Sequence, residues 1–193
     1  MKRLVFFASG SGTNFQSVID TIHTGPADAR IYGLVSNKPK AGALERAKKH
    51  DIPVKILSPA SFATQEKYAE NLLQTLQAWQ PDLIVLAGYL LKIPPLVIKA
   101  YPEQIINIHP SLLPKFGGEG FYGKRVHKAV IEAGEAQSGC TVHIVDEAYD
   151  QGPVLEQRRV PVLDNDTPET LAERVLEEEH ELLPEVILNY FQS

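Results

Sequence analysis

The residues best suited to chemistry are an amide and an imidazole two positions apart, Asn107 and His109, in the segment 105–114 (IINIHPSLLP). Side chains alternate between the faces of a strand, so both polar groups point to one face while the neighbouring isoleucines point to the other. Pro110 ends the strand, which places the pair at a strand terminus, where ligands of open α/β sheets bind. Together they can donate hydrogen bonds to a carbonyl oxygen under nucleophilic attack. The alternative is that His109 is a structural residue whose hydrogen bonds are satisfied within the fold.

Three acids, Asp146, Glu147 and Asp150, precede a Gly-Pro turn at 152–153. A carboxylate at this place could orient His109, raise its pKa or relay a proton. Acids before a turn are also typical of a solvated loop, and the residues alone do not choose among the three. No spacing of Cys, His and acidic residues near the pair suggests a metal site.

A glycine turn follows the first apolar run, which reads SGSGTN at 9–14 and leads into a helical pattern. Free N–H groups and the positive end of the helix dipole favour an anion there, and a single phosphate is the natural occupant. The glycines allow close backbone approach, and the other side chains add donors; the set is Gly10, Ser11, Gly12, Thr13 and Asn14. The alternative is a capped turn with nothing bound. A dinucleotide fold is not expected, because Phe15 occupies the third glycine position.

Apolar runs alternate with helical stripes along the first two thirds of the chain, which predicts βαβ units and a mostly parallel sheet. The predicted strands are 4–8, 31–35, 54–57, 83–87 and 105–108, and helical stripes cover 15–22 and 68–79. A short helix is expected near 126–132. The runs 140–145 and 154–162 should pair with each other or add an antiparallel edge.

The last segment opens with Asp166, Thr167 and Pro168, which is typical of an N-cap followed by proline in the first helical turn. Pro184 should kink or divide that helix. No linker separates two domains. The sequence therefore predicts one domain over 1–193, a Rossmann-like α/β fold with a mostly parallel twisted sheet and helices on both faces. Its phosphate-binding part covers about 1–100, and its catalytic part about 101–193.

Composition excludes several classes of protein. The chain has 193 residues, 44% hydrophobic and 22% charged, and no apolar run of the ~20 residues that a membrane span needs. A net charge of −5 without a basic block argues against nucleic acid as the main partner. The short apolar start is better interpreted as a buried strand than as a signal peptide. Cys140 is the only cysteine, which excludes an internal disulfide and fits a cytoplasmic location.

Four motifs together, SGSGTN, INIHPSLLPKF, GCTVHIV and YDQGPV, closely resemble the folate-dependent formyltransferase superfamily over nearly the whole chain. Within it, the likeness is to the enzymes that pass a formyl group from 10-formyltetrahydrofolate, the co-substrate, to the amine of glycinamide ribonucleotide in purine biosynthesis. The resemblance implies two small-molecule substrates. Together with composition and residue spacing, the expectation is a cytoplasmic monomer or homodimer that uses no metal, nucleic acid or membrane.

The resemblance also implies site residues. The catalytic asparagine, histidine and aspartate of the family fall on Asn107, His109 and Asp150. The phosphate loop falls on Gly12 to Asn14, and a glutamate near the substrate amine or ribose falls on Glu179, which could instead be one more acid of a solvated run. The folate segment falls on Leu90, Leu91, Lys92 and Ile93, with Asn107 also facing the folate.

Two features depart from the family pattern. The usual basic residue of the folate segment is displaced, and the lysine of this chain is Lys92. The loop 115–125 (KFGGEGFYGKR) is longer and richer in glycine than in many relatives, and it could act as a mobile lid or be a plain surface loop. His127 and His143 are expected to be structural. The rival functions are a formyltetrahydrofolate deformylase, another superfamily member, or a non-catalytic nucleotide-binding module that uses only the glycine turn.

Overall fold

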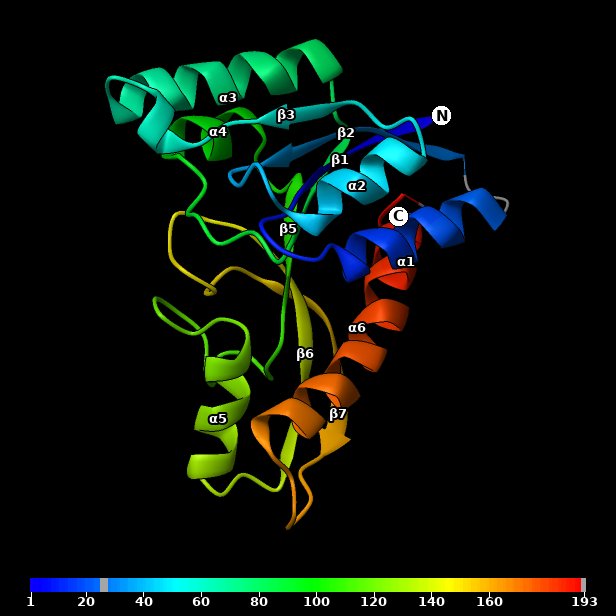
Figure 1. Cartoon of the computed structure of the whole chain (residues 1–193), viewed down its shortest axis with the longest axis vertical. Helices are drawn as coiled ribbons and strands as arrows, with labels where there is room; N and C mark the ends of the chain where they lie inside the picture. Colours follow the sequence, from blue (N-terminus) through cyan, green and yellow to red (C-terminus); the bar gives the residue numbers. More distant parts are fainter. Residues whose placement is uncertain (25–27, 192–193) are drawn as a thin grey trace. The chain divides into compact units, whose positions relative to one another are not determined.

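The computed structural model describes residues 1–24 and 28–191, which form alternating strands and helices (Figure 1). The strands are β1 (Lys2–Phe7), β2 (Ala29–Ser36), β3 (Val54–Ile56), β4 (Leu83–Ala87), β5 (Ile105–His109), β6 (Gln137–Ile144) and β7 (Val154–Pro161). The helices are α1 (Thr13–Thr24), α2 (Gly42–Lys49), α3 (Gln65–Trp79), α4 (Pro95–Ala100), α5 (Lys124–Glu132) and α6 (Pro168–Tyr190), with a 3₁₀ turn η1 (Pro59–Ser61).

The seven strands form one sheet in the order β3-β2-β1-β4-β5-β6-β7. Strand β1 is parallel to β2 and β4, and β2 is parallel to β3, whereas β6 and β7 are antiparallel. The predicted α/β fold with a mostly parallel sheet is therefore confirmed, and so is the pairing of the last two strands. By contacts the chain forms two compact units, Met1–Ile106 and Asn107–Ser193. The prediction of one domain with parts divided near residue 100 stays a prediction.

In the first unit the strand order reverses beside β1. The chain moves outward through α1 and α2 from β1 to β3, and α3 then returns it to β4 on the other side of β1. Right-handed crossovers place α1 and α2 on one face and α3 on the other, as Figure 1 shows. Ligands of such sheets bind where the order reverses, outside the carboxyl ends of the two strands, which here are β1 and β4.

Burial explains why β1 is apolar along its length. Leu4 to Phe7 are fully buried, because helices cover both faces of a parallel strand. The interpretation of the amino terminus as a strand is confirmed. In the part of the chain that the structure describes, no helix is long and apolar enough to cross a membrane.

In the second unit α6 packs against β6 and β7 and also contacts α5 (Figure 1). Thr167 caps it by accepting a hydrogen bond from the Thr170 amide at 3.2 Å, and Pro168 stands in the first turn, as predicted. Pro184 was predicted to kink or divide this helix; the division is wrong, and the kink stays a prediction. The helix is continuous to Tyr190 and the Pro184 ring is buried in its apolar stripe, so packing outweighs the lost backbone hydrogen bond.

Candidate active site

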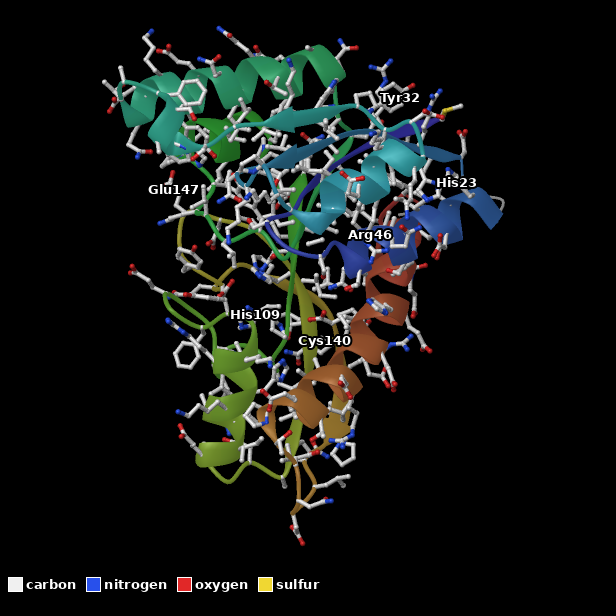
Figure 2. All side chains as sticks on the ribbon, viewed as in Figure 1. His23, Tyr32, Arg46, His109, Cys140 and Glu147 are labelled. Carbon is white, nitrogen blue, oxygen red and sulfur yellow. The ribbon has the colours of Figure 1, made fainter. Side chains whose placement is uncertain are left out.

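His109 is the centre of a buried polar cluster in the second unit (Figure 2). It ends β5, is 5% exposed, and its Nε2 lies 2.8 Å from the carbonyl oxygen of Phe116. Because a carbonyl can only accept, Nε2 carries a hydrogen and the other ring nitrogen, Nδ1, faces the carboxylate of Asp150 at 3.6 Å. Protonation of the ring therefore places a second N–H at Nδ1.

Opposing effects act on the charge of His109. Burial lowers the pKa of the imidazole below its ordinary value, while the charge of Asp150 and the Phe116 carbonyl raise it again. A neighbouring histidine, His143, lowers it further. The ring is thus a buried base whose protonated form depends on one carboxylate.

Asp150 joins two histidines. Its Oδ1 lies 3.6 Å from Nε2 of His143, and its Oδ2 accepts a hydrogen bond from the Gly118 amide at 2.9 Å. Burial alone would raise the pKa of this carboxyl, but the nearby His143 and His109 rings and the Gly118 amide together hold the pKa below its usual value. Asp150 also has φ 53, in the left-handed region that Asp and Asn tolerate best.

The three acids that the sequence left open are thus separated by position. Asp150 faces the histidines with its side chain 8% exposed, whereas Glu147 is exposed on the same loop (Figure 2). Asp146 accepts a hydrogen bond from the Ala148 amide, as a loop acid does. Of the three acids, Asp150 is the one that faces His109.

Asn107 is oriented by His143, which sequence reasoning had treated as structural. The Nδ1 of His143 lies 2.9 Å from the Ile144 carbonyl and so carries a hydrogen, and in the neutral ring Nε2 accepts from Nδ2 of Asn107 at 3.1 Å. His143 is 2% exposed and belongs to the cluster. The signal that could have found it is a polar residue near the end of an otherwise buried strand.

The loop 115–125 begins inside this cluster. Phe116 supplies the carbonyl at His109, Gly118 supplies the amide at Asp150, and the Ser111 hydroxyl donates to the Lys115 carbonyl at 2.7 Å. The start of the loop is therefore more than a plain surface connection. It fixes both partners of the histidine–carboxylate pair.

Two further buried groups lie in the same unit. Burial, with a smaller contribution from His109, lowers the pKa of His127 to about 4, and its Nδ1 has no hydrogen-bond partner among the described residues. Burial and the nearby Glu179 raise the pKa of the Cys140 thiol to about 12, so the only cysteine stays protonated at neutral pH and is a poor nucleophile. Within the described ranges no group of His, Cys, Asp and Glu side chains could hold a metal ion.

Glu179 is not part of a solvated acidic run. It is 6% exposed on the buried stripe of α6 that also carries Leu171 and Val175, while Glu177 and Glu181 face the solvent. The alternative of a solvated acid is therefore wrong for Glu179. Its predicted contact with the substrate stays a prediction.

In the first unit the glycine turn follows β1 at the reversal of strand order. Three consecutive carbonyls of the turn are each held by a donor: Gly10 by the Ala43 amide at 3.1 Å, Ser11 by Nε of Arg46 at 2.9 Å, and Gly12 by the Gln16 amide at 2.9 Å. Gly12 has φ 74, and a Cβ there would lie 2.7 Å from that of Ala43. Glycine is therefore required for both conformation and space.

Ser9 connects this turn to the segment after β4. Its amide donates to the Gly88 carbonyl at 3.1 Å, and its hydroxyl accepts from the Leu90 amide at 3.0 Å while donating to Oδ1 of Asn37 at 2.6 Å. The hydroxyl is buried, with Ser9 3% exposed. The start of the glycine turn and the start of the predicted folate segment are thus joined by one side chain.

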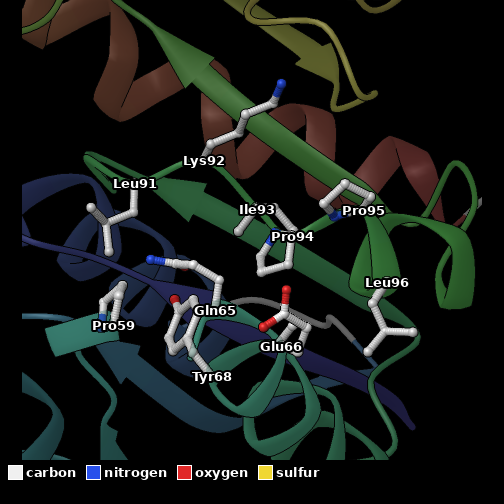
Figure 3. A pocket seen from close by; sticks show the side chains of 11 residues that line it. Pro59, Gln65, Glu66, Tyr68, Leu91, Lys92, Ile93, Pro94, Pro95 and Leu96 are labelled. Atoms are coloured by element: carbon white, nitrogen blue, oxygen red, sulfur yellow. The ribbon is translucent and has the colours of Figure 1, made fainter. Parts of the chain in front are cut away.

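The segment after β4 borders a cavity of about 460 Å³ (Figure 3). Leu91, Lys92 and Ile93 of the predicted folate segment line it, opposite Tyr68 and its neighbours on α3. The other lining residues are Pro59, Gln65, Glu66, Ala69, Pro94, Pro95 and Leu96. Most of these side chains are apolar, and cavities of this size and lining are typical of sites for small organic molecules.

The first unit has a reversal of strand order with a glycine turn, and the second has a half-buried amide with a buried imidazole and carboxylate. These features define an open α/β protein with an acid–base cluster of the kind that serves group transfer. Comparison with known proteins gives the family. The chain matches the formyl transferase family over residues 2–187, and it belongs to that family.

Several relatives are close in sequence and structure. The chain is 47% identical over 186 residues to a chloroplastic phosphoribosylglycinamide formyltransferase of Vigna unguiculata, with 96% of this chain and 60% of the relative covered. The corresponding protein of Arabidopsis thaliana is 44% identical, with 96% and 64% covered. The chain thus spans less than two thirds of these two relatives. A glycinamide ribonucleotide transformylase 1 structure from Geobacillus kaustophilus is 42% identical, has a TM-score of 0.91, and is matched over 98% of each chain.

Proposed function

We propose that this protein transfers a formyl group from 10-formyltetrahydrofolate to the amine of glycinamide ribonucleotide. The observation that carries the proposal is the cluster in which Nδ1 of the His109 ring faces the buried carboxylate of Asp150 at 3.6 Å. It occurs in a member of the formyl transferase family whose relatives carry this activity in their names.

In the proposed reaction the substrate amine attacks the formyl carbon directly. The carbonyl oxygen becomes an oxyanion, which the Asn107 amide and the positive charge of the protonated His109 ring stabilise. Asp150 favours the protonated ring and takes part in removing the proton that the amine loses, directly or through water. The bond from the formyl carbon to the folate nitrogen then breaks, and that nitrogen gains a proton. No protein nucleophile is required, in keeping with the protonated thiol of Cys140.

Binding is assigned to the first unit and to Glu179. The turn of Gly10, Ser11, Gly12, Thr13 and Asn14 holds the phosphate of the ribonucleotide, because its N–H groups lie at the amino terminus of α1. We assign Glu179 to the amine or ribose.

The cavity beside Leu90, Leu91, Lys92 and Ile93 suits an aromatic folate, and Lys92 supplies a cation for its carboxylates. Asn107 also faces the folate in this proposal. Holding two substrates in one orientation can supply roughly 7–11 kcal/mol of the rate enhancement.

Turnover in two variants tests the catalytic proposal. His109→Ala and Asn107→Ala should each lower formyl transfer by about 10²-fold or more, while His23→Ala, an exposed histidine on α1 (Figure 2), should not. Native turnover in both site variants would favour the non-catalytic nucleotide-binding module. Consumption of 10-formyltetrahydrofolate without the ribonucleotide would favour the deformylase.

A cytoplasmic location and a monomeric or homodimeric state complete the proposal. The single cysteine supports a reducing compartment. Two plant relatives are chloroplastic by name. Size-exclusion chromatography with light scattering decides the oligomeric state.

A further inference from the structure

Helix α2, which carries no predicted apolar stripe, lies against the glycine turn. Its first residues leave no room for a side chain on Gly12, and a Cβ on Gly42 would lie 3.1 Å from the Ser11 carbonyl oxygen. Helices α1 and α2 contact each other, and Arg46, on α2, is labelled beside α1 in Figure 2. The turn is therefore packed between the helix it begins and the helix that follows the next strand.

The held carbonyls determine where the amides point. In a trans peptide the C=O of one residue and the N–H of the next lie in one plane and point in opposite directions. The bond from the Ala43 amide to the Gly10 carbonyl therefore aims the Ser11 N–H, and the bond from Arg46 to the Ser11 carbonyl aims the Gly12 N–H. Successive N–H groups aimed together form an anion-binding concavity.

The Ser11–Gly12 peptide plane can rotate more easily than a plane between two residues other than glycine. Glycine accepts positive and negative φ with similar ease, so Gly12 resists a rotated plane less than another residue would. Rotation would turn the Ser11 carbonyl, a partial negative charge, towards a bound anion and remove an N–H donor. Among the carbonyls of Gly10, Ser11 and Gly12, that of Ser11 is held by a side chain, Nε of Arg46 at 2.9 Å, and the other two by backbone amides.

We propose that Arg46 is a positioning residue for the phosphate-binding turn, which acts by holding the Ser11 carbonyl away from a bound phosphate monoester. The guanidinium is itself braced, because Nη1 donates to Oε1 of Gln16 at 3.3 Å and Gln16 Nε2 donates to Asp20 at 2.8 Å. Arg46 acts through backbone geometry and not as a direct ligand. The inference rests on the proposed function, which places the ribonucleotide phosphate at this turn.

The test measures binding of two probes, glycinamide ribonucleotide and its dephosphorylated riboside, by isothermal titration calorimetry. Arg46→Met should weaken ribonucleotide binding about tenfold, the effect of losing one charge-assisted hydrogen bond, and leave riboside binding unchanged. Lys49→Met is the matched control, because it removes the same charge from an exposed position on the same helix. It should change ribonucleotide affinity by less than about twofold.

Two further measurements separate positioning from charge. Arg46→Lys keeps the charge but loses the planar guanidinium, so it should bind the ribonucleotide about threefold more weakly than the native protein. It replaces Arg46→Met in the test if that variant does not fold. The ratio between native and Arg46→Met affinities should persist in high salt, which screens long-range attraction.

Equal effects of Arg46→Met and Lys49→Met, or native affinity in Arg46→Met, would overturn the inference and leave the proposed function intact. If the native chain binds ribonucleotide and riboside equally, the proposed function itself fails.

Discussion

Replacing Asp150 by asparagine removes one negative charge from the middle of the histidine cluster and changes little else. Asparagine tolerates the left-handed backbone that Asp150 adopts at φ 53, and its amide oxygen can still accept from the Gly118 amide. The loop should keep its conformation. The variant therefore isolates the effect of the charge.

The size of that effect follows from the distance. Asp150 lies 3.6 Å from Nδ1 of His109, and unit charges at about 4 Å attract by about 4 kcal/mol at an effective dielectric constant near 20. Losing that attraction removes the main effect that raises the pKa of His109, so the pKa falls in Asp150→Asn. Burial already lowers this pKa, and without Asp150 it acts unopposed. The ring then stays neutral to a lower pH.

Steady-state formyl transfer to glycinamide ribonucleotide measures the consequence. With the protonated ring disfavoured, kcat/KM of Asp150→Asn should fall by about 10²- to 10⁴-fold, and the limb of the pH profile that His109 controls should move to lower pH. Glu147→Gln, an exposed acid of the same loop, is the control and should behave as the native protein. If Asp150→Asn keeps its activity within twofold and an unshifted profile, Asp150 does not act on His109.

Three further outcomes are expected. Gly12→Ala should raise the KM for the ribonucleotide and lower the melting temperature, because φ 74 and the neighbouring helix exclude a Cβ. A native KM would show that the turn does not bind the ribonucleotide. Lys92→Met should raise the KM for the folate a few-fold in low salt only, and the exposed control Lys99→Met should not. In the folded protein the pKa of His127 is lowered to about 4. As the pH falls, the unfolded chain therefore binds a proton at His127 before the folded chain does. The free energy of unfolding should fall by about 3 kcal/mol between pH 6.5 and pH 4. Urea unfolding of His127→Asn should show a flatter fall than that of the exposed control His23→Asn, and equal slopes would contradict the assigned cause.

The sequence predicted elements wherever burial leaves a periodic pattern. Strand β4 has the predicted bounds 83–87, and α3 covers the predicted stripe from Tyr68 to Trp79. Helix α2 was missed because only two alanines, Ala43 and Ala47, are buried in it, and alanine gives a weak periodic signal. Its role beside the glycine turn could not be predicted without it.

The residues of the candidate site could be predicted from the sequence, but the contacts between their side chains could not. Strand alternation placed Asn107 and His109 on one face, whereas the residues alone could not choose Asp150 among three acids. That choice depends on a chain reversal that brings the loop back to β5, a contact distant in sequence. His143 was assigned to the fold because a buried histidine on a strand is common, and only the 3.1 Å contact with Asn107 distinguishes it.

The hydroxyl of Ser9 has a consequence for engineering this protein. Because the Ser9 hydroxyl accepts from the backbone of Leu90 and Ser9 also begins the glycine turn, each of the two loops restricts which segment can replace the other. A transplanted segment after β4 has to offer an N–H at position 90, which rules out proline there, and a transplanted turn has to begin with a hydroxyl. Chimeras that move both loops together keep the bond and should fold as well as their parents.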